Sequence, residues 1–150
     1  MIKISLASDH AGYFLKEEIK SFLSKAGYSI DDFGAFNDQP IDYVDTGLKA
    51  AKYTADGNSD IGILICGTGQ GMNIIANKVK GIRACLCMTN DFAKLARQHN
   101  NANVLVLPGR FIETKAALEI VDTFLNEPFS EETRHKNRIK KINKYENNEV

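Results

Sequence analysis

A cysteine followed by three closely spaced glycines is the part of this sequence best suited to chemistry. Gly67, Gly69 and Gly71 lie within five residues, directly after Cys66 and the apolar run 61–65, and a segment of helical pattern follows them. Backbone N–H groups in such a loop converge on an anion at the start of a helix. The helix dipole also favours the thiolate form of a cysteine modestly, and a thiolate can abstract a proton from carbon. The segment therefore predicts an anion site beside a candidate base.

Two other interpretations of this loop stay open. A tight strand-to-helix turn explains one or two of the glycines, and a cysteine at such a place is more often part of the core. A nucleotide-binding loop is the second alternative, since Asp91 lies 20 residues beyond Gly71, where a dinucleotide site has its acidic ribose ligand. However, the loop has neither a Walker ending nor the GxGxxG pattern, and Asp91 fits the first turn of the next predicted helix. We therefore favour the functional interpretation of the loop and of Cys66.

Basic residues near the end of the chain have the spacing of a phosphate clamp. Arg134 and Arg138 stand four positions apart, so on a helix both guanidinium groups project from one face. The alternative is a solvated basic face, because several lysines lie nearby: Lys136, Lys140, Lys141 and Lys144. His99 and the pair Asp9-His10 are further candidates, although each could simply end or cap a helix. Their occurrence together favours a functional site.

The fold that must position these residues follows from the alternation of short β-branched runs with longer segments of helical period. This alternation is typical of βαβ units and predicts a parallel sheet. We expect strands at 2–8, 28–33, 61–66, 82–87 and 103–107, and helices at 13–25, 43–56, 71–79, 90–99 and 113–126, with a final helix beginning near residue 130. The predicted fold is a three-layer α/β/α sandwich around a five-stranded parallel Rossmann-like sheet, with a C-terminal helix.

The predicted sheet also indicates where the chemistry lies. Ligands of open parallel sheets bind beyond the carboxyl ends of the strands. Four of the predicted strand ends carry polar residues, at 9–10, 66–71, 89–91 and 109–110. We therefore expect the functional site at this edge of the sheet.

The composition is that of a single globular domain, which we expect to span residues 1–150. Of the 150 residues, 43% are hydrophobic and 25% charged, and 19 Lys+Arg balance 19 Asp+Glu. Zero net charge argues against a nucleic-acid partner, and no apolar run is long enough for a signal peptide or a membrane span. We expect a cytoplasmic protein with a small-molecule substrate and no membrane partner.

The cysteines and histidines argue against a disulfide framework and against a metal site. The three cysteines are an odd number without CxxC spacing, and Cys85 and Cys87 share one face of a predicted strand, as small buried hydrophobic residues do. The three histidines lack the i, i+4 spacing of metal ligands. We expect no cofactor and no metal.

Taken together, these residues resemble the type B ribose-5-phosphate isomerases and the related galactose-6-phosphate isomerase subunits. The resemblance covers nearly the whole chain and is carried by the segments 7–12, 42–43, 65–72, 76–78, 81–83, 97–100, 103–104, 109–110 and 134–138. One departure is Thr133, where relatives often have Gly. The resemblance implies an aldose–ketose isomerase of the pentose phosphate pathway, which interconverts ribose 5-phosphate and ribulose 5-phosphate through an enediolate without metal.

The resemblance also implies roles for the matching residues. Cys66 is expected to be the proton-abstracting base, assisted by the Thr68 hydroxyl, and His99 is expected to open the sugar ring. The expected substrate-binding residues are Asp9 and Asn100 at the sugar hydroxyls, His10, Arg110, Arg134 and Arg138 at the phosphate, and Tyr43, Gly67, Gly69, Gln70 and Gly71 around the reacting carbons.

Finally, the resemblance implies a homodimer or homotetramer with sites shared between subunits. The stretch carrying His99, Asn100 and Arg110 is expected to reach into the pocket whose Cys66 belongs to the neighbouring subunit. Galactose-6-phosphate isomerases divide the catalytic residues between two different chains, whereas here they occur in one chain. An isomerase of a 6-phosphorylated hexose of the allose or galactose type, or a non-catalytic module that binds a nucleotide or sugar phosphate, are the alternatives.

Overall fold

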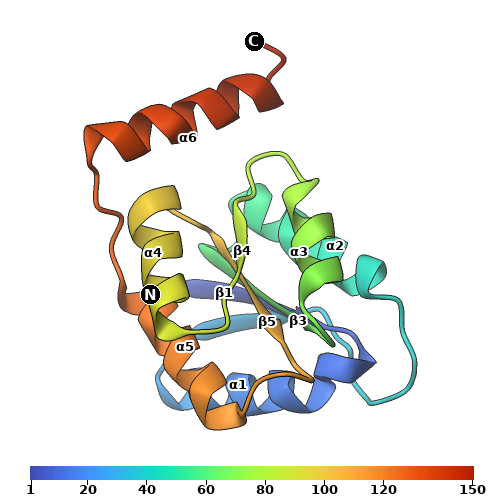
Figure 1. The fold of residues 1–150 in the computed structure, drawn as a ribbon. Coiled ribbons are helices and arrows are strands. Elements are labelled where there is room, and N and C mark those ends of the chain that lie inside the picture. Colours follow the sequence, from blue (N-terminus) through green and yellow to red (C-terminus); the bar gives the residue numbers. More distant parts are fainter.

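Strands and helices alternate along the chain in the computed structural model, which describes residues 1–150 (Figure 1). The elements are β1 (Lys3–Ser8), the 3-10 helix η1 (His10–Gly12), α1 (Tyr13–Lys25), β2 (Ser29–Asp32), α2 (Tyr43–Ala55), β3 (Ile61–Cys66), α3 (Gln70–Asn77), β4 (Ala84–Leu86), α4 (Asn90–Asn100), β5 (Val104–Pro108), α5 (Thr114–Asn126) and α6 (Thr133–Glu146).

The five strands form one sheet in the order β2-β1-β3-β5-β4, and every neighbouring pair is parallel. Helices α1, α4 and α5 pack on one face of this sheet, and α2 and α3 pack on the other. The predicted fold class is therefore confirmed. The central strands are continuously apolar because helices cover both of their faces, as in β3, where all six residues are buried.

The edge strand β4 is shorter than the predicted strand at 82–87. Ile82 still belongs to the turn after α3, since its N–H donates to the carbonyl oxygen of Val79 (3.1 Å). The free edge of β4 is covered by Asn77, whose side-chain amide accepts from the Ala84 N–H (2.8 Å) and donates to the Ala84 carbonyl (2.9 Å). A side chain thus pairs with the edge as a neighbouring strand would, which protects it from pairing with another chain.

A buried ion cluster ties α1 to the end of β2. Lys16 is fully buried and its Nζ lies 2.6 Å from Asp32 Oδ2, which also pairs with Lys20 at 2.8 Å. The other Asp32 oxygen accepts the Gly34 N–H (2.9 Å). Burial alone would raise the pKa of Asp32, but these ion pairs and the backbone donor outweigh it, so that the pKa is lowered. The cluster thereby holds the segment after β2 in place.

Helix α6 begins later than the sequence indicates and lies apart from the sheet. The expected start near Ser130 is wrong: Glu131 has a left-handed φ of +58°, and the helix starts at Thr133. Helix α6 lies beyond the end of α4, away from the other helices (Figure 1). None of the helices combines the length and the apolar composition that a membrane crossing requires.

Candidate functional site

The carboxyl ends of β1 and β3 bring the first candidate residues together. From β1 the chain continues to β2 on one side, whereas β3 lies on the other side of β1. In an open parallel sheet, ligands bind in the crevice beyond the strand ends where the two connections diverge, and we call this place the crevice. Ser8 is in register with Ile65, and the Asp9 N–H donates to the Ile65 carbonyl oxygen (3.2 Å). Asp9 and Cys66, the next residues on these strands, therefore stand side by side, 8% and 4% exposed.

The glycine-rich loop is tightly packed, and at two of its glycines there is no room for a side chain. Gly69 has a φ of +76° and is the residue before α3, and a Cβ there would lie 2.5 Å from a Leu86 methyl carbon. A Cβ on Gly71 would lie 2.6 Å from the ring of Tyr43. Any side chain at either position would displace the loop from its neighbours. The loop thus turns directly from Cys66 into the start of α3, as the sequence predicts.

The side chains around this loop are held by hydrogen bonds. His10 Nδ1 lies within hydrogen-bond distance of both the N–H (3.2 Å) and the carbonyl oxygen (3.3 Å) of Ile41. Asp9 Oδ1 accepts the Gly12 N–H (3.1 Å), so Asp9 does cap η1, and its second oxygen carries no such bond. The Thr68 hydroxyl accepts the Gln70 N–H (3.2 Å). Both members of the pair Asp9-His10 are thus fixed at the mouth of the crevice.

Arg110 lies with this loop and not with His99. Its N–H donates to the Gly67 carbonyl oxygen (3.0 Å), and its Cδ would lie 3.4 Å from a Cβ on Gly67. The expectation that Arg110 accompanies His99 into a neighbouring subunit's pocket is therefore wrong. The physical reason is that β5 pairs with β3, so the residue that follows β5 lies beside the loop that follows β3.

His99 and Asn100 lie at the other end of the sheet, where the amino ends of the strands are. They end α4, which starts just after the carboxyl end of β4 and runs back toward the amino ends of the strands. His99 is nine residues beyond Asn90, which corresponds to about 14 Å along the helix. The ring of His99 lies 4.4 Å from the ring of His135 in α6. One chain therefore does not bring His99 to Cys66.

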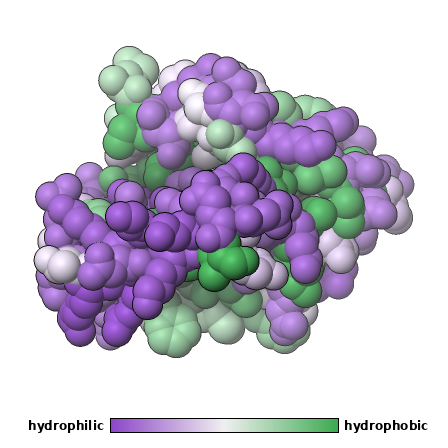
Figure 2. All heavy atoms as spheres, turned by 90° about the horizontal axis from the view of Figure 1, so that it is seen from above, coloured by the Kyte–Doolittle hydropathy of each residue, from purple (hydrophilic) through white to green (hydrophobic).

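The two arginines of α6 lie on the His99 side. Arg138 is exposed, and Arg134, 61% exposed, has its Nε 2.9 Å from Glu132. Seen from the α6 side, the surface is mostly hydrophilic (Figure 2). The predicted site residues thus form two groups. The loop group consists of Asp9, His10, Tyr43, Cys66, Gly67, Thr68, Gly69, Gln70, Gly71 and Arg110, and the His99 group consists of His99, Asn100, Arg134 and Arg138.

Comparison with known proteins identifies the family that has this fold. Residues 4–142 match the family described as Ribose/Galactose Isomerase. The chain belongs to this family. Among proteins of the family, the probable ribose-5-phosphate isomerase B of Mycoplasma genitalium is 46% identical over 145 residues, 95% of each chain. The ribose-5-phosphate isomerase B of Escherichia coli is 41% identical over 142 residues, again 95% of each chain.

Solved structures of the family have the same fold. The ribose 5-phosphate isomerase of Thermotoga maritima superposes with a TM-score of 0.92 at 49% identity, covering 95% of this chain and 98% of that one. The Mycoplasma genitalium enzyme, solved with bound ribulose 5-phosphate, superposes with a TM-score of 0.92 at 43% identity, covering 97% of this chain and 96% of that one.

Two features of this family member were not evident from its sequence. His135 is only 2% exposed, and burial, together with Arg134 and His99, lowers its pKa. Beside the glycine-rich loop, Thr68 and Gln70 share a cavity of about 210 Å³ with Met88 and Phe111, which are 50% and 66% exposed. The signal for the second feature was present in the sequence, since large apolar residues follow the ends of two strands.

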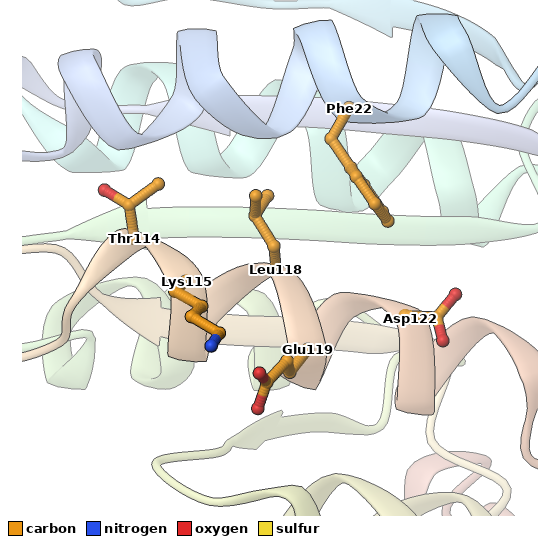
Figure 3. A pocket seen from close by; sticks show the side chains of 6 residues that line it. All are labelled: Phe22, Thr114, Lys115, Leu118, Glu119 and Asp122. Carbon is orange, nitrogen blue, oxygen red and sulfur yellow. The ribbon is translucent and has the colours of Figure 1, made fainter.

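The largest cavity of the molecule does not contain these residues. It is a groove of about 650 Å³ between α1 and α5, in which Phe22 and Leu118 point toward each other across the gap (Figure 3). Its other lining residues are polar or charged, and none belongs to the predicted site. The groove is therefore separate from the predicted site residues.

The cysteines other than Cys66 are structural. Cys85 and Cys87 face the same side of the sheet, toward α4 and α5, as predicted. Cys87 is 1% exposed, and burial raises the pKa of its thiol to about 12. All three cysteines are free thiols, and the structure holds no group of three or more His, Cys, Asp or Glu residues placed to bind a metal ion.

Proposed function

We propose that this chain is an isomerase that interconverts ribose 5-phosphate and ribulose 5-phosphate. Its family and its relatives named ribose-5-phosphate isomerase B support the proposal. The observation that carries it is that Asp9 and Cys66 stand side by side at the ends of β1 and β3, next to the glycine-rich loop. A proton transfer between neighbouring carbons needs a base and an oxyanion site within one small crevice.

Cys66 is the base of the proposed reaction. Its thiolate takes the proton from C2 of the open-chain aldose and returns it to C1, through an enediolate, with the Thr68 hydroxyl assisting. Backbone N–H groups between Gly67 and Gly71 point toward the developing oxyanion. The loop packs against Leu86 and Tyr43, and donors that packing holds in place need little reorganisation during the reaction.

The other predicted residues bind the substrate and open its ring. His99 transfers the protons that open the furanose, and Asp9 and Asn100 bind sugar hydroxyls. Tyr43 and Gln70 line the pocket around the reacting carbons. The phosphate group is bound by His10, Arg110, Arg134 and Arg138, since guanidinium groups pair with phosphate through two hydrogen bonds.

The proposed site requires two subunits. The loop group and the His99 group lie at opposite edges of the sheet, and a histidine side chain is too short to bridge them. The apolar side chains of Met88, Phe92 and Phe111 are between 50% and 66% exposed on the side of α4 and the glycine-rich loop, and they support a contact with a second copy. We infer at least a homodimer in which His99, Asn100, Arg134 and Arg138 of one chain complete the crevice of the other.

The proposal is tested by a coupled isomerase assay with EDTA present. The substrates are ribose 5-phosphate, allose 6-phosphate and galactose 6-phosphate, and binding of NAD and ATP is measured by thermal unfolding. We expect turnover of the pentose phosphate at an undiminished rate in EDTA. Turnover of a hexose phosphate alone, no turnover at all, or a loss restored by a divalent metal would each contradict the proposal. The cytoplasmic location and the single domain over 1–150 stay predictions.

A further inference from the structure

Two half-buried arginines converge at the amino edge of the sheet, opposite the crevice. Arg83 directly precedes β4 and Arg97 belongs to α4. Arg83 Nη2 donates to the backbone carbonyl of Asn101 (2.9 Å), and Arg97 Nη1 donates to the side-chain oxygen of the same residue (3.1 Å). The two guanidinium groups are thus gathered around one asparagine, although they come from different elements.

Neither guanidinium group is in direct contact with a carboxylate, although burial lowers the pKa of Arg83 and the charge of the nearby Glu146 acts against this effect. Neither takes part in any of the ion pairs of the chain, all of which join other residues. Their remaining hydrogen bonds go to backbone carbonyls: Arg83 Nε donates to Asn100 (2.8 Å), and Arg97 donates to Glu127 and Ala102. Nη1 of Arg83 and Nη2 of Arg97 have no partner. Both groups stay protonated, because arginine does not lose its charge in proteins.

The unpaired donors belong to one cavity. Arg83 and Arg97 line a cavity of about 360 Å³ at the amino ends of the strands, whose apolar wall includes Phe124 and Leu125. Arg97 lies over the ring of Phe124, 5.6 Å from its centre. An apolar wall lowers the local dielectric constant, which strengthens the attraction between a cation and an anion. The volume exceeds that of several water molecules, each of which takes about 30 Å³.

The carboxylates near the cavity are engaged elsewhere. Asp60 is the only acid that lines it, and its Oδ2 accepts the Lys3 N–H (2.8 Å). Glu146 lies with Arg83 around an adjoining cavity, where its carboxylate accepts the Gly81 N–H (3.2 Å). The cavity itself is lined by two cations and one carboxylate, and Glu146 acts on Arg83 from the adjoining cavity.

We propose that this cavity binds a phosphate dianion, free or as a monoester, between Arg83 and Arg97. Guanidinium groups bind phosphate oxygens through paired, charge-assisted hydrogen bonds, and a dianion matches two cations better than a chloride ion does. The site is separate from the crevice beside Cys66, since Arg83 directly precedes β4 at the amino ends of the strands and Cys66 is at the carboxyl end of β3. The inference does not depend on the reaction proposed above.

Ile2 offers a test that leaves both arginines in place. It lines the cavity, is 37% exposed, and precedes β1. Ile2→Glu places a tethered carboxylate beside the two guanidinium groups, and Ile2→Gln is the matched neutral control. Thermal unfolding of both variants and of the wild type is measured with inorganic phosphate, with phenyl phosphate, and with chloride at equal ionic strength. Binding at the crevice is common to all three proteins, so differences between them report on this cavity.

We expect phosphate to raise the Tm of the wild type and of Ile2→Gln by about 4 °C more than that of Ile2→Glu, at ten times the dissociation constant of the cavity. In chloride at low ionic strength, the Tm of Ile2→Glu should be higher than that of Ile2→Gln, because the introduced carboxylate pairs with the two guanidinium groups. Asp60→Asn, which removes the lining carboxylate, should enlarge the shift caused by phosphate. The isomerase kcat and KM of both Ile2 variants should equal those of the wild type.

The two ligands distinguish the sources of the phosphate. A larger shift with phenyl phosphate supports a monoester whose carbon part packs on Phe124 and Leu125, and a larger shift with inorganic phosphate supports the free ion. Equal phosphate shifts in the wild type, Ile2→Gln and Ile2→Glu, or a smaller shift in Asp60→Asn, would overturn the proposal.

Discussion

Two inactive variants, Cys66→Ala and His99→Asn, should restore activity when they share a dimer. The reason is the distance within one chain: Cys66 ends β3 at the carboxyl edge of the sheet, whereas His99 lies about 14 Å back along α4, in its last turn. In a mixed dimer, one site receives both lesions. The other site combines an intact cysteine from one chain with an intact histidine from the other.

The size of the recovery follows from the statistics of twofold assembly. After equimolar mixing and random reassociation, about half of the dimers are mixed, and each has one intact site, so about a quarter of all sites should be active. A site built within one chain would contain one lesion in every copy and would gain nothing from mixing.

The assay is co-refolding of the two purified variants, followed by isomerase activity and by native mass spectrometry to count mixed dimers. The matched control is Cys66→Ala with Thr68→Val, whose lesions lie on the same loop, and this pair should show no recovery. If mixed dimers form and the activity of the first pair stays at the average of its parents, His99 and Cys66 act within the same chain and the shared site is refuted.

Three further predictions concern single residues. Cys66→Ala should retain phosphosugar binding within a few-fold but keep less than about 1% of turnover, and higher turnover measured by the coupled assay would exclude Cys66 as the base. Arg138→Ala should weaken substrate binding and turnover together, while Lys140→Ala on the same helix should leave both unchanged; identical kinetics for the two would favour a merely solvated basic face. In the folded state, burial raises the pKa of Asp32, but the ion pairs, chiefly with Lys16, outweigh burial and the pKa is lowered. The contribution of Asp32 to the free energy of unfolding is therefore complete above about pH 4, the pKa of the unfolded chain, and is lost as the pH falls through the lowered pKa of the folded state. Asp32→Asn should therefore be less stable at pH 7 and show a flatter loss of stability between about pH 4 and 2 in urea unfolding; parallel pH profiles would contradict this reasoning.

Local signals predicted most of the elements. The predicted strand over 61–66 and the predicted helix over 13–25 have the observed bounds, because an apolar run between polar and glycine residues and a stripe of helical period depend on residues close in sequence. The predicted start of α6 differs from the observed one. Ser130 has the character of a residue that caps a helix, and its hydroxyl does accept the Glu132 N–H (3.3 Å). Glu131, however, has a left-handed φ of +58°, so the helix begins only at Thr133.

Neighbours along the chain are enough to specify the glycine-rich loop, its place after a buried strand, and the position of Cys66 before a helix start, so these features can be predicted from the sequence. Which candidate residues meet depends instead on the arrangement of the strands and helices. Because β5 inserts between β3 and β4, Arg110 lies against Gly67, although in sequence it stands much closer to His99. Arg83 and Arg97 likewise meet only because the start of β4 and the end of α4 lie around Asn101. Strand order and helix direction depend on the burial of whole faces, which no local pattern specifies.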